Sequence, residues 1–184
     1  MFIQTEQTPN PATLKFLPGC AVAPGGTAHF ADAAAARRSP LAERLFAVPG
    51  VAGVFLGTDF VTVSKVEDGD WYQLKPAILA AIMEHFTTGR PVFLVAEGDD
   101  TAAEAEAEDD EIVSQIKELL ETRVRPAVAQ DGGDIIFYDY QDGVVYLHMQ
   151  GSCSGCPSST ATLKAGIENM LRYYVPEVVE VRAV

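Results

Sequence analysis

The sequence predicts an α+β fold: two small domains of mixed helix and strand, joined by an acidic linker. The linker is evident from its composition, because residues 97–111 hold nine carboxylates, no lysine or arginine and no large apolar residue. Such a segment cannot bury a core, and its like charges repel one another. An exposed helix rich in alanine and glutamate is the alternative, which the same repulsion opposes. We therefore predict an N-terminal domain at residues 1–96, a flexible linker at 97–109 and a C-terminal domain at 110–184.

The N-terminal domain shows the patterns of strands and of two helices. Ser39 and Pro40 open the first helix, since serine caps a helix N-terminus and proline fits its first turn. In the second helix, Leu74, Ile78 and Ile82 recur on one face. The predicted strands are residues 2–5, 13–17, 51–56 and 60–66, and the second predicted helix is residues 71–86.

The C-terminal domain shows the order α-β-β-α-β. Pro126 should kink or reset the first helix, because proline has no amide hydrogen and its ring crowds the preceding turn. Asp142 and Gly143 are typical of the tight turn in an antiparallel hairpin. The predicted helices are residues 111–129 and 160–174, the strands are 135–140, 144–149 and 178–184, and a turn is predicted at 131–134.

The overall charge narrows the class of partner. The chain carries a net charge of −13, much of it in the linker, which argues against nucleic acid or an anionic membrane as a partner. No apolar stretch approaches the roughly 20 residues that cross a bilayer. Three cysteines are too few for a disulfide framework, and residues 1–6 do not have the pattern of a signal peptide. These observations predict a cytoplasmic protein.

The segment with the clearest chemistry is the loop between the second strand and the second helix of the C-terminal domain. It places Cys153 and Cys156 three positions apart among glycine and serine, and because these neighbours are small the pair should lie near the surface. Thiolates bind soft metal centres, and the following helix N-terminus favours anions. A cubane iron–sulfur cluster usually takes four cysteines, as does one common kind of zinc site. One copy of the chain cannot supply four from one place, whereas two copies can.

Three interpretations of this cysteine pair stay open from its spacing alone. They are an iron–sulfur cluster shared between two subunits, a dithiol–disulfide redox centre, and a zinc ion at a dimer interface. The redox interpretation is opposed by the lack of a βαβ unit before the motif. It is also opposed by the lack of a later proline where a substrate clamp is expected.

The loop and its surroundings resemble the C-terminal domain of NifU, the Nfu domain. The resemblance is carried by the run 151–160, by 162–164 and 166–168 after it, and by 124–128 and 131–135 before it. The first domain resembles the N-terminal domain of mitochondrial and bacterial Nfu proteins, through residues 7–11, 14–16, 39–42 and 61–65. Together these segments extend over nearly the whole chain.

The resemblance implies an iron–sulfur cluster carrier or scaffold and not an enzyme. In the family, a labile 4Fe–4S cluster is held between two subunits by the cysteines that match Cys153 and Cys156; a 2Fe–2S cluster is the alternative left open. The cluster passes to apo-proteins, typically aconitase-like and lipoyl-synthase-like, and an upstream donor is implied. The N-terminal domain is associated with target recognition. The further domains of full NifU have no counterpart here, which favours a late-acting carrier. A dithiol oxidoreductase is the alternative function.

The remaining candidate residues have simpler interpretations. Cys20 matches no ligand position of the family and is interpreted as a buried or incidental residue. The histidines have no ligand spacing with the cysteines, and His148 is interpreted as a sheet residue. Asp131 and Asp134 could attract a divalent ion, but a glycine-rich turn accounts for them.

Overall fold

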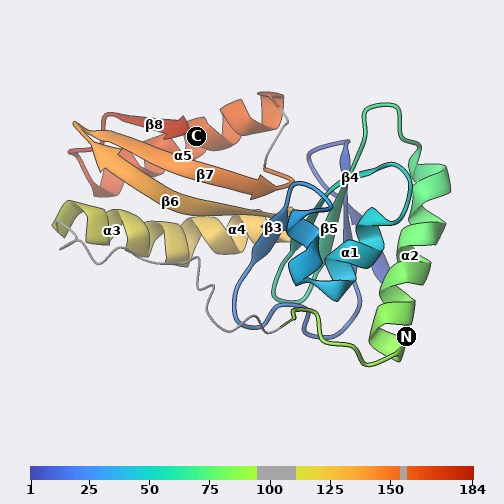
Figure 1. Ribbon diagram of the computed structural model, residues 1–184. Coiled ribbons are helices and arrows are strands. Elements are labelled where there is room, and N and C mark those ends of the chain that lie inside the picture. The colour runs from blue at the N-terminus through green and yellow to red at the C-terminus, as the bar shows by residue number, and fades with distance from the viewer. Residues whose placement is uncertain (95–110, 154–156) are drawn as a thin grey trace. The chain divides into compact units, whose positions relative to one another are not determined.

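The computed structural model describes residues 1–94, 111–153 and 157–184, with the backbone alone at 157–160 (Figure 1). The predicted linker at 97–109 lies outside the described residues. The chain forms two compact units, Met1–Glu97 and Gly98–Val184. Each unit mixes helix and strand, so the predicted α+β class is confirmed. Within the described residues, no helix has the length and apolar character required to traverse a bilayer.

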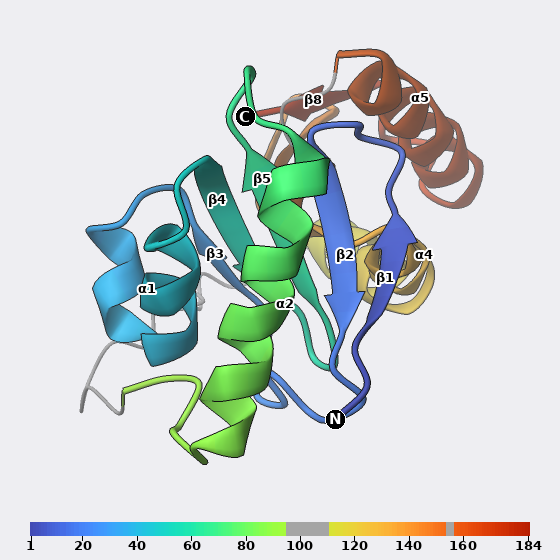
Figure 2. The same cartoon turned by 90° about the vertical axis from the view of Figure 1, so that its right-hand side faces the viewer.

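The first unit is built on a five-stranded antiparallel sheet. Its strand order is β1-β2-β5-β4-β3, and both α-helices of the unit lie on one face of the sheet (Figure 2). The elements are β1 (Gln4–Gln7), β2 (Thr13–Leu17), β3 (Ala28–Phe30), a 3₁₀ helix (Ala35–Arg38), α1 (Pro40–Phe46), β4 (Val51–Leu56), β5 (Val61–Lys65) and α2 (Trp71–Thr87). Strand β3 was not predicted, because three residues are too few to show a period of two.

The helices of this unit begin where their capping residues require. Ser39 Oγ accepts a hydrogen bond from the Ala42 amide at 3.2 Å, as predicted, and Pro40 is the first residue of α1. The same hydroxyl donates to the Val92 carbonyl, so it also holds the segment after α2. At α2, the Asp70 carboxylate accepts the Tyr72 amide at 2.9 Å. Each cap satisfies a backbone donor that a helix start leaves unpaired.

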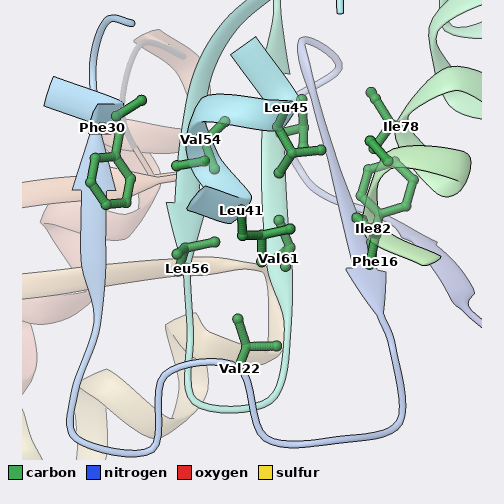
Figure 3. Packing of buried hydrophobic residues seen from close by; sticks show 14 of the residues in the cluster. Phe16, Val22, Phe30, Leu41, Leu45, Val54, Leu56, Val61, Ile78 and Ile82 are labelled. Atoms are coloured by element: carbon green, nitrogen blue, oxygen red, sulfur yellow. The ribbon is translucent and has the colours of Figure 1, made fainter. Parts of the chain in front are cut away.

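The core of the first unit lies between the sheet and its helices. Phe16 from β2 and Leu56 from β4 face Leu41 of α1 and Ile78 of α2, all of them fully buried (Figure 3). Burial of each such side chain contributes roughly 1.5–3 kcal/mol. This packing fixes both helices on the sheet.

The second unit has the predicted order of helices and strands. Its elements are α3 (Glu111–Leu119), a π-helical turn (Leu120–Val124), α4 (Arg125–Gln130), β6 (Gly133–Gln141), β7 (Val144–Gly151), α5 (Pro157–Tyr174) and β8 (Glu180–Ala183). Strand β7 is central: it pairs antiparallel with β6 and parallel with β8. Helix α5 is the crossover that the parallel pair requires. Side chains from all these elements form one apolar core.

Pro126 produces the predicted interruption of the first helix as a π-helical turn. The Arg125 amide donates to the Leu120 carbonyl, five residues back, instead of the usual four. Pro126 has no amide hydrogen, and in an unbroken α-helix its ring would clash with the carbonyl of Thr122. The wider π turn relieves this clash, and α4 continues after it. Leu120 and Val124 remain buried in the core, so the turn is held in place at both ends.

The hairpin turn between β6 and β7 matches its sequence signal. Asp142 and Gly143 have φ angles of 50° and 81°, so both occupy the left-handed region of a type I′ turn. A Cβ on Gly143 would lie 2.9 Å from the Glu177 carbonyl oxygen. This turn sets the register of the residue pairs next to it, and an irregularity between Phe137 and Asp139 shifts the register by one residue for the pairs beside the cysteine loop.

His85 makes the stability of the first unit depend on pH. The imidazole is fully buried at the end of α2, and burial followed by the charges of Arg44 on α1 and of Arg90 lowers its pKa from 6.5, opposed in part by the backbone of Arg90. The unfolded chain therefore binds a proton below about pH 6.5 that the folded unit resists. Unfolding by urea, followed through the single tryptophan, Trp71, should show stability falling as the pH drops from 7.5 to 5.5.

Two variants test the assignment of this acid sensitivity. His85→Leu should remove most of the loss between pH 7.5 and 5.5, because leucine has no proton to gain. His148→Gln is the matched control, since His148 is exposed on β7 in the other unit, and its pH profile should follow the unmodified chain. An unchanged slope in His85→Leu would assign the acid sensitivity to other groups.

Candidate functional site

The cysteine loop joins the end of β7 to the start of α5. Gly151 is the last residue of β7 and has a φ of 64°, a conformation that glycine adopts without strain. Cys153 follows two residues later, and α5 begins at Pro157. Cys156 lies outside the described residues, so the geometry of the pair is not part of the structure. The described part of the site consists of Ser152, Cys153 and the turn opposite them.

Cys153 is buried and not at the surface, where the small neighbouring residues had suggested the pair would lie. Only 6% of its surface is exposed, and it belongs to the apolar core of the second unit. The thiol packs against the first residue of β6, Gly133. A Cβ added to Gly133 would clash with Cys153 Sγ and would lie 3.0 Å from the Cys153 amide nitrogen. A glycine at residue 133 is therefore what leaves room for the thiol.

The predicted turn at 131–134 holds the base of the loop. The Ser152 hydroxyl donates to the Asp131 carbonyl at 2.5 Å, and the Ser152 amide donates to the Gly132 carbonyl at 3.3 Å. Gly133 pairs with Gly151 in the hairpin. These contacts place the turn and the start of the loop side by side. Asp131 is a turn residue as interpreted, whereas Asp134 is the second residue of β6, because the strand begins at Gly133, inside the predicted turn.

The Cys153 thiol is held in its protonated form. Burial raises its pKa to about 11, the charges of Asp131 and Asp134 add to the rise, and a hydrogen bond with Ser152 opposes it. The sequence had suggested the opposite, because a helix N-terminus lowers thiol pKa values. Desolvation outweighs that effect in the described state. Metal binding at Cys153 must therefore remove a proton from a buried thiol.

Arg125 was not predicted as part of this site. Its Nε and Nη2 atoms donate to the two carboxylate oxygens of Asp134, each at 2.9 Å, and Nη1 donates to Glu121 Oε2 at 2.7 Å. Asp134 is 3% exposed, and its Oδ1 also accepts the Ile135 amide at 2.8 Å. These hydrogen bonds raise the pKa of Arg125. The one local signal was the four-residue spacing of Glu121 and Arg125; the partner nine residues on has no periodic signature.

Most of the other candidate residues belong to the first unit and not to the unit that holds the loop. Cys20 and His29 belong to the first unit, as does the buried His85. His148 is exposed on β7, with Nδ1 3.2 Å from the Val184 carbonyl oxygen. Among residues 1–94, 111–153 and 157–184, no group of three or more histidine, cysteine, aspartate or glutamate side chains is arranged to hold a metal ion.

Both parts of the chain match known families. Residues 3–89 match the family described as "Scaffold protein Nfu/NifU N terminal", and residues 116–182 match the "NifU-like domain". The two matches fall in separate compact units. They agree with the two segments whose motifs resembled Nfu proteins.

Curated relatives match along the whole chain. The "NFU1 iron-sulfur cluster scaffold homolog, mitochondrial" of Drosophila grimshawi is 54% identical over 184 residues, covering 100% of this chain and 61% of the relative. The protein of the same name from Drosophila willistoni is 54% identical over 185 residues and is covered to 64%. The chain thus spans less than two thirds of the length of these relatives. A solved NifU-like protein from Saccharomyces cerevisiae is 26% identical, with a TM-score of 0.47, over 52% of this chain and 87% of that one.

The predicted cytoplasmic location is wrong, since the names of these relatives contain the word mitochondrial. The prediction rested on cysteine content, on the lack of long apolar stretches and on residues 1–6. None of these distinguishes one intracellular compartment from another.

The two family matches and the relatives at 54% identity indicate the same family, at residues 3–89 and at residues 116–182. The chain belongs to the Nfu family and carries both an Nfu/NifU N-terminal domain and a NifU-like domain.

Proposed function

We propose that two copies of this chain hold one iron–sulfur cluster through Cys153 and Cys156 of each copy and pass it to apo-proteins. The observation that carries the proposal is the seat of Cys153, where a turn with glycine at residue 133 leaves room for the thiol at the β7–α5 junction. The scaffold names of the relatives support the same function.

The number of available ligands supports a cluster shared by two copies. The second unit contains two cysteines, and Cys20 belongs to the first unit. A 4Fe–4S cluster usually takes four cysteines, so one NifU-like domain supplies half of the set. Retention of the cluster is then linked to association of the two chains, because each stabilises the other. We propose 4Fe–4S as the cargo, with 2Fe–2S as the alternative.

The protonated state of Cys153 supports a carrier that releases its cargo. With the pKa at about 11 instead of the ordinary 9.0, deprotonation in place costs about 3 kcal/mol more per chain than for an exposed thiol. This cost lowers the affinity for the cluster, and re-protonation favours its release. The raised pKa opposes the alternative of a dithiol oxidoreductase, whose reactive thiol needs a lowered pKa.

We propose a division of labour along the chain. Residues 1–96 would recognise recipients, residues 97–109 would join the two domains, and residues 110–184 would hold the cluster. The two compact units support this division. The resemblance suggests aconitase-like and lipoyl-synthase-like recipients and an upstream donor. No turnover step is needed, so the protein would act as a carrier and not as an enzyme.

Removal of either loop cysteine tests the ligand assignment. Cys153→Ser and Cys156→Ser should each abolish the cluster after anaerobic reconstitution, because each variant removes one of the two ligands on each chain and so two of the four in the dimer. Iron and sulfide counts on size-exclusion fractions, together with absorption spectra, measure the result. The unmodified chain should give a coloured dimer with about four irons per two chains.

Cys20→Ser is the matched control and should load like the unmodified chain. A full cluster in either loop variant would disprove the assignment. A colourless monomer whose two loop thiols oxidise reversibly would instead support the oxidoreductase.

Gly133→Ala tests the seat of the thiol without removing a ligand. The added methyl group clashes with Cys153 Sγ, so the loop must shift, and we expect cluster retention about 10- to 100-fold weaker, as for other residues that support metal ligands. Gly166→Ala is the control, because a Cβ on that helical residue meets nothing within 4 Å. It should load normally and gain up to about 1 kcal/mol of stability. Equal retention in the two variants would show that the seat does not position the ligand.

A further inference from the structure

We propose that Arg125 is a positioning residue for the cysteine loop: by clamping Asp134 it fixes residues 131–134, the turn and the first two residues of β6, against which Ser152 and Cys153 are held. The inference rests on the proposed function, because it concerns the same cysteine. It assigns a role to a residue of α4 whose described side-chain hydrogen bonds go to Asp134 and Glu121 and not to a cysteine.

The clamp itself is a planar, two-pronged contact. Two nitrogens of one guanidinium donate to the two oxygens of one buried carboxylate, each at 2.9 Å. The Ile135 amide adds a third donor to Asp134. Such a fork fixes orientation as well as distance, which a lysine ammonium cannot do. Asp134 is therefore held in one place relative to α4.

Residues 131–134 connect the fixed Asp134 to the cysteine loop. Asp134 pairs with Gln150 across the hairpin, and the preceding residue, Gly133, pairs with Gly151 and contacts the Cys153 thiol. The carbonyls of Asp131 and Gly132 accept the hydroxyl and the amide of Ser152. Each of residues 131–134 thus contacts the loop or the last residues of β7. A displacement of Asp134 would therefore shift the residues that pack against the Cys153 thiol.

The π-helical turn explains how Arg125 comes to face Asp134. It ends at Val124, immediately before Arg125, and one extra residue in a helix rotates the remainder of that helix by roughly 100°. Glu121, which lies within the π-helical turn, accepts a hydrogen bond from the third guanidinium nitrogen, Nη1. The guanidinium is therefore anchored both on its own helical segment, through Glu121, and on the start of β6, through Asp134. Such π turns are often found at functional sites.

A purely stabilising role for the ion pair is the alternative. Removal of one partner of a buried pair leaves an uncompensated charge and weakens any fold. The two roles differ in their effect on Cys153 at equal stability, and in whether a lysine can substitute for the arginine.

The experiment measures the reactivity of Cys153 in the full apo-chain. Arg125→Lys, Arg125→Met and Asp134→Asn are treated with iodoacetamide under native conditions, and labelling of each cysteine is followed by mass spectrometry. Val181→Ala is the control, because it removes a buried side chain from β8, away from the turn. Cys20 in the first unit reports whether the rest of the chain is unchanged. The stability of each variant is measured alongside, so that variants of equal stability are compared.

We expect all three clamp variants to expose Cys153, with labelling faster than in the unmodified chain and in Val181→Ala. Arg125→Lys keeps the charge and loses the fork, so it should resemble Arg125→Met in reactivity. After reconstitution, the clamp variants should retain the cluster about 10- to 100-fold less well, with an altered visible circular dichroism spectrum. In the double variant Arg125→Met/Asp134→Asn, Cys153 should be no more reactive than in either single variant, because both substitutions remove the same contact.

Two results would overturn the proposal. The first is an Arg125→Lys chain whose Cys153 is labelled, and whose cluster is retained, as in the unmodified protein. The positive charge of residue 125 would then be sufficient, and the two-pronged contact would have no role. The second is a Val181→Ala chain whose Cys153 is as reactive as in the clamp variants. If the unmodified chain holds no cluster, the proposed function fails, and the labelling of the apo-chain still decides the role of Arg125.

Discussion

The pairing of Gly133 with Gly151 is the contact on which the site depends. It joins the first residue of β6 to the last residue of β7, at the end of the hairpin opposite its turn. The lack of a side chain at residue 133 lets the thiol of Cys153 occupy the space that a Cβ there would fill. The burial of the thiol, its raised pKa and the hydrogen bonds of Ser152 all follow from this close approach.

On the proposed function, that close approach would distinguish the second unit from a protein with a preformed metal site. The described state shields one proposed ligand and keeps it protonated, although the thiolate form is the one that binds iron. Binding of a cluster then competes with core packing at Cys153. A scaffold that must give up its cargo gains from such competition, whereas a permanent cofactor site would not.

Much of the fold could be predicted because its signals are local. The cap at Ser39, the interruption at Pro126 and the turn at Asp142 and Gly143 each depend on a few neighbouring residues, and each was found. The order α-β-β-α-β followed from the same local patterns.

The features that could not be predicted depend on contacts between distant residues. The burial of Cys153 comes from packing against Gly133, and a loop of small residues gives no sign of it in the sequence. The link from Arg125 to Asp134 joins two residues nine positions apart, a spacing that matches no helix or strand period. The cysteine pair itself was conspicuous, but its spacing alone allowed a cluster, zinc or a disulfide.

The central place of β7 also bears on how the site is assembled as the chain is made. The hydrogen bonds and the close packing that seat Cys153 join residues between 121 and 153, all of which lie before α5 and β8 in the chain. Synthesis proceeds from the N-terminus, and units generally fold in that order. The helices α3 and α4 and the β6–β7 hairpin are therefore complete before the parallel strand β8 emerges. A nascent chain therefore has all the residues that line the seat of the thiol before it has α5 and β8, whose side chains complete the core that buries the thiol.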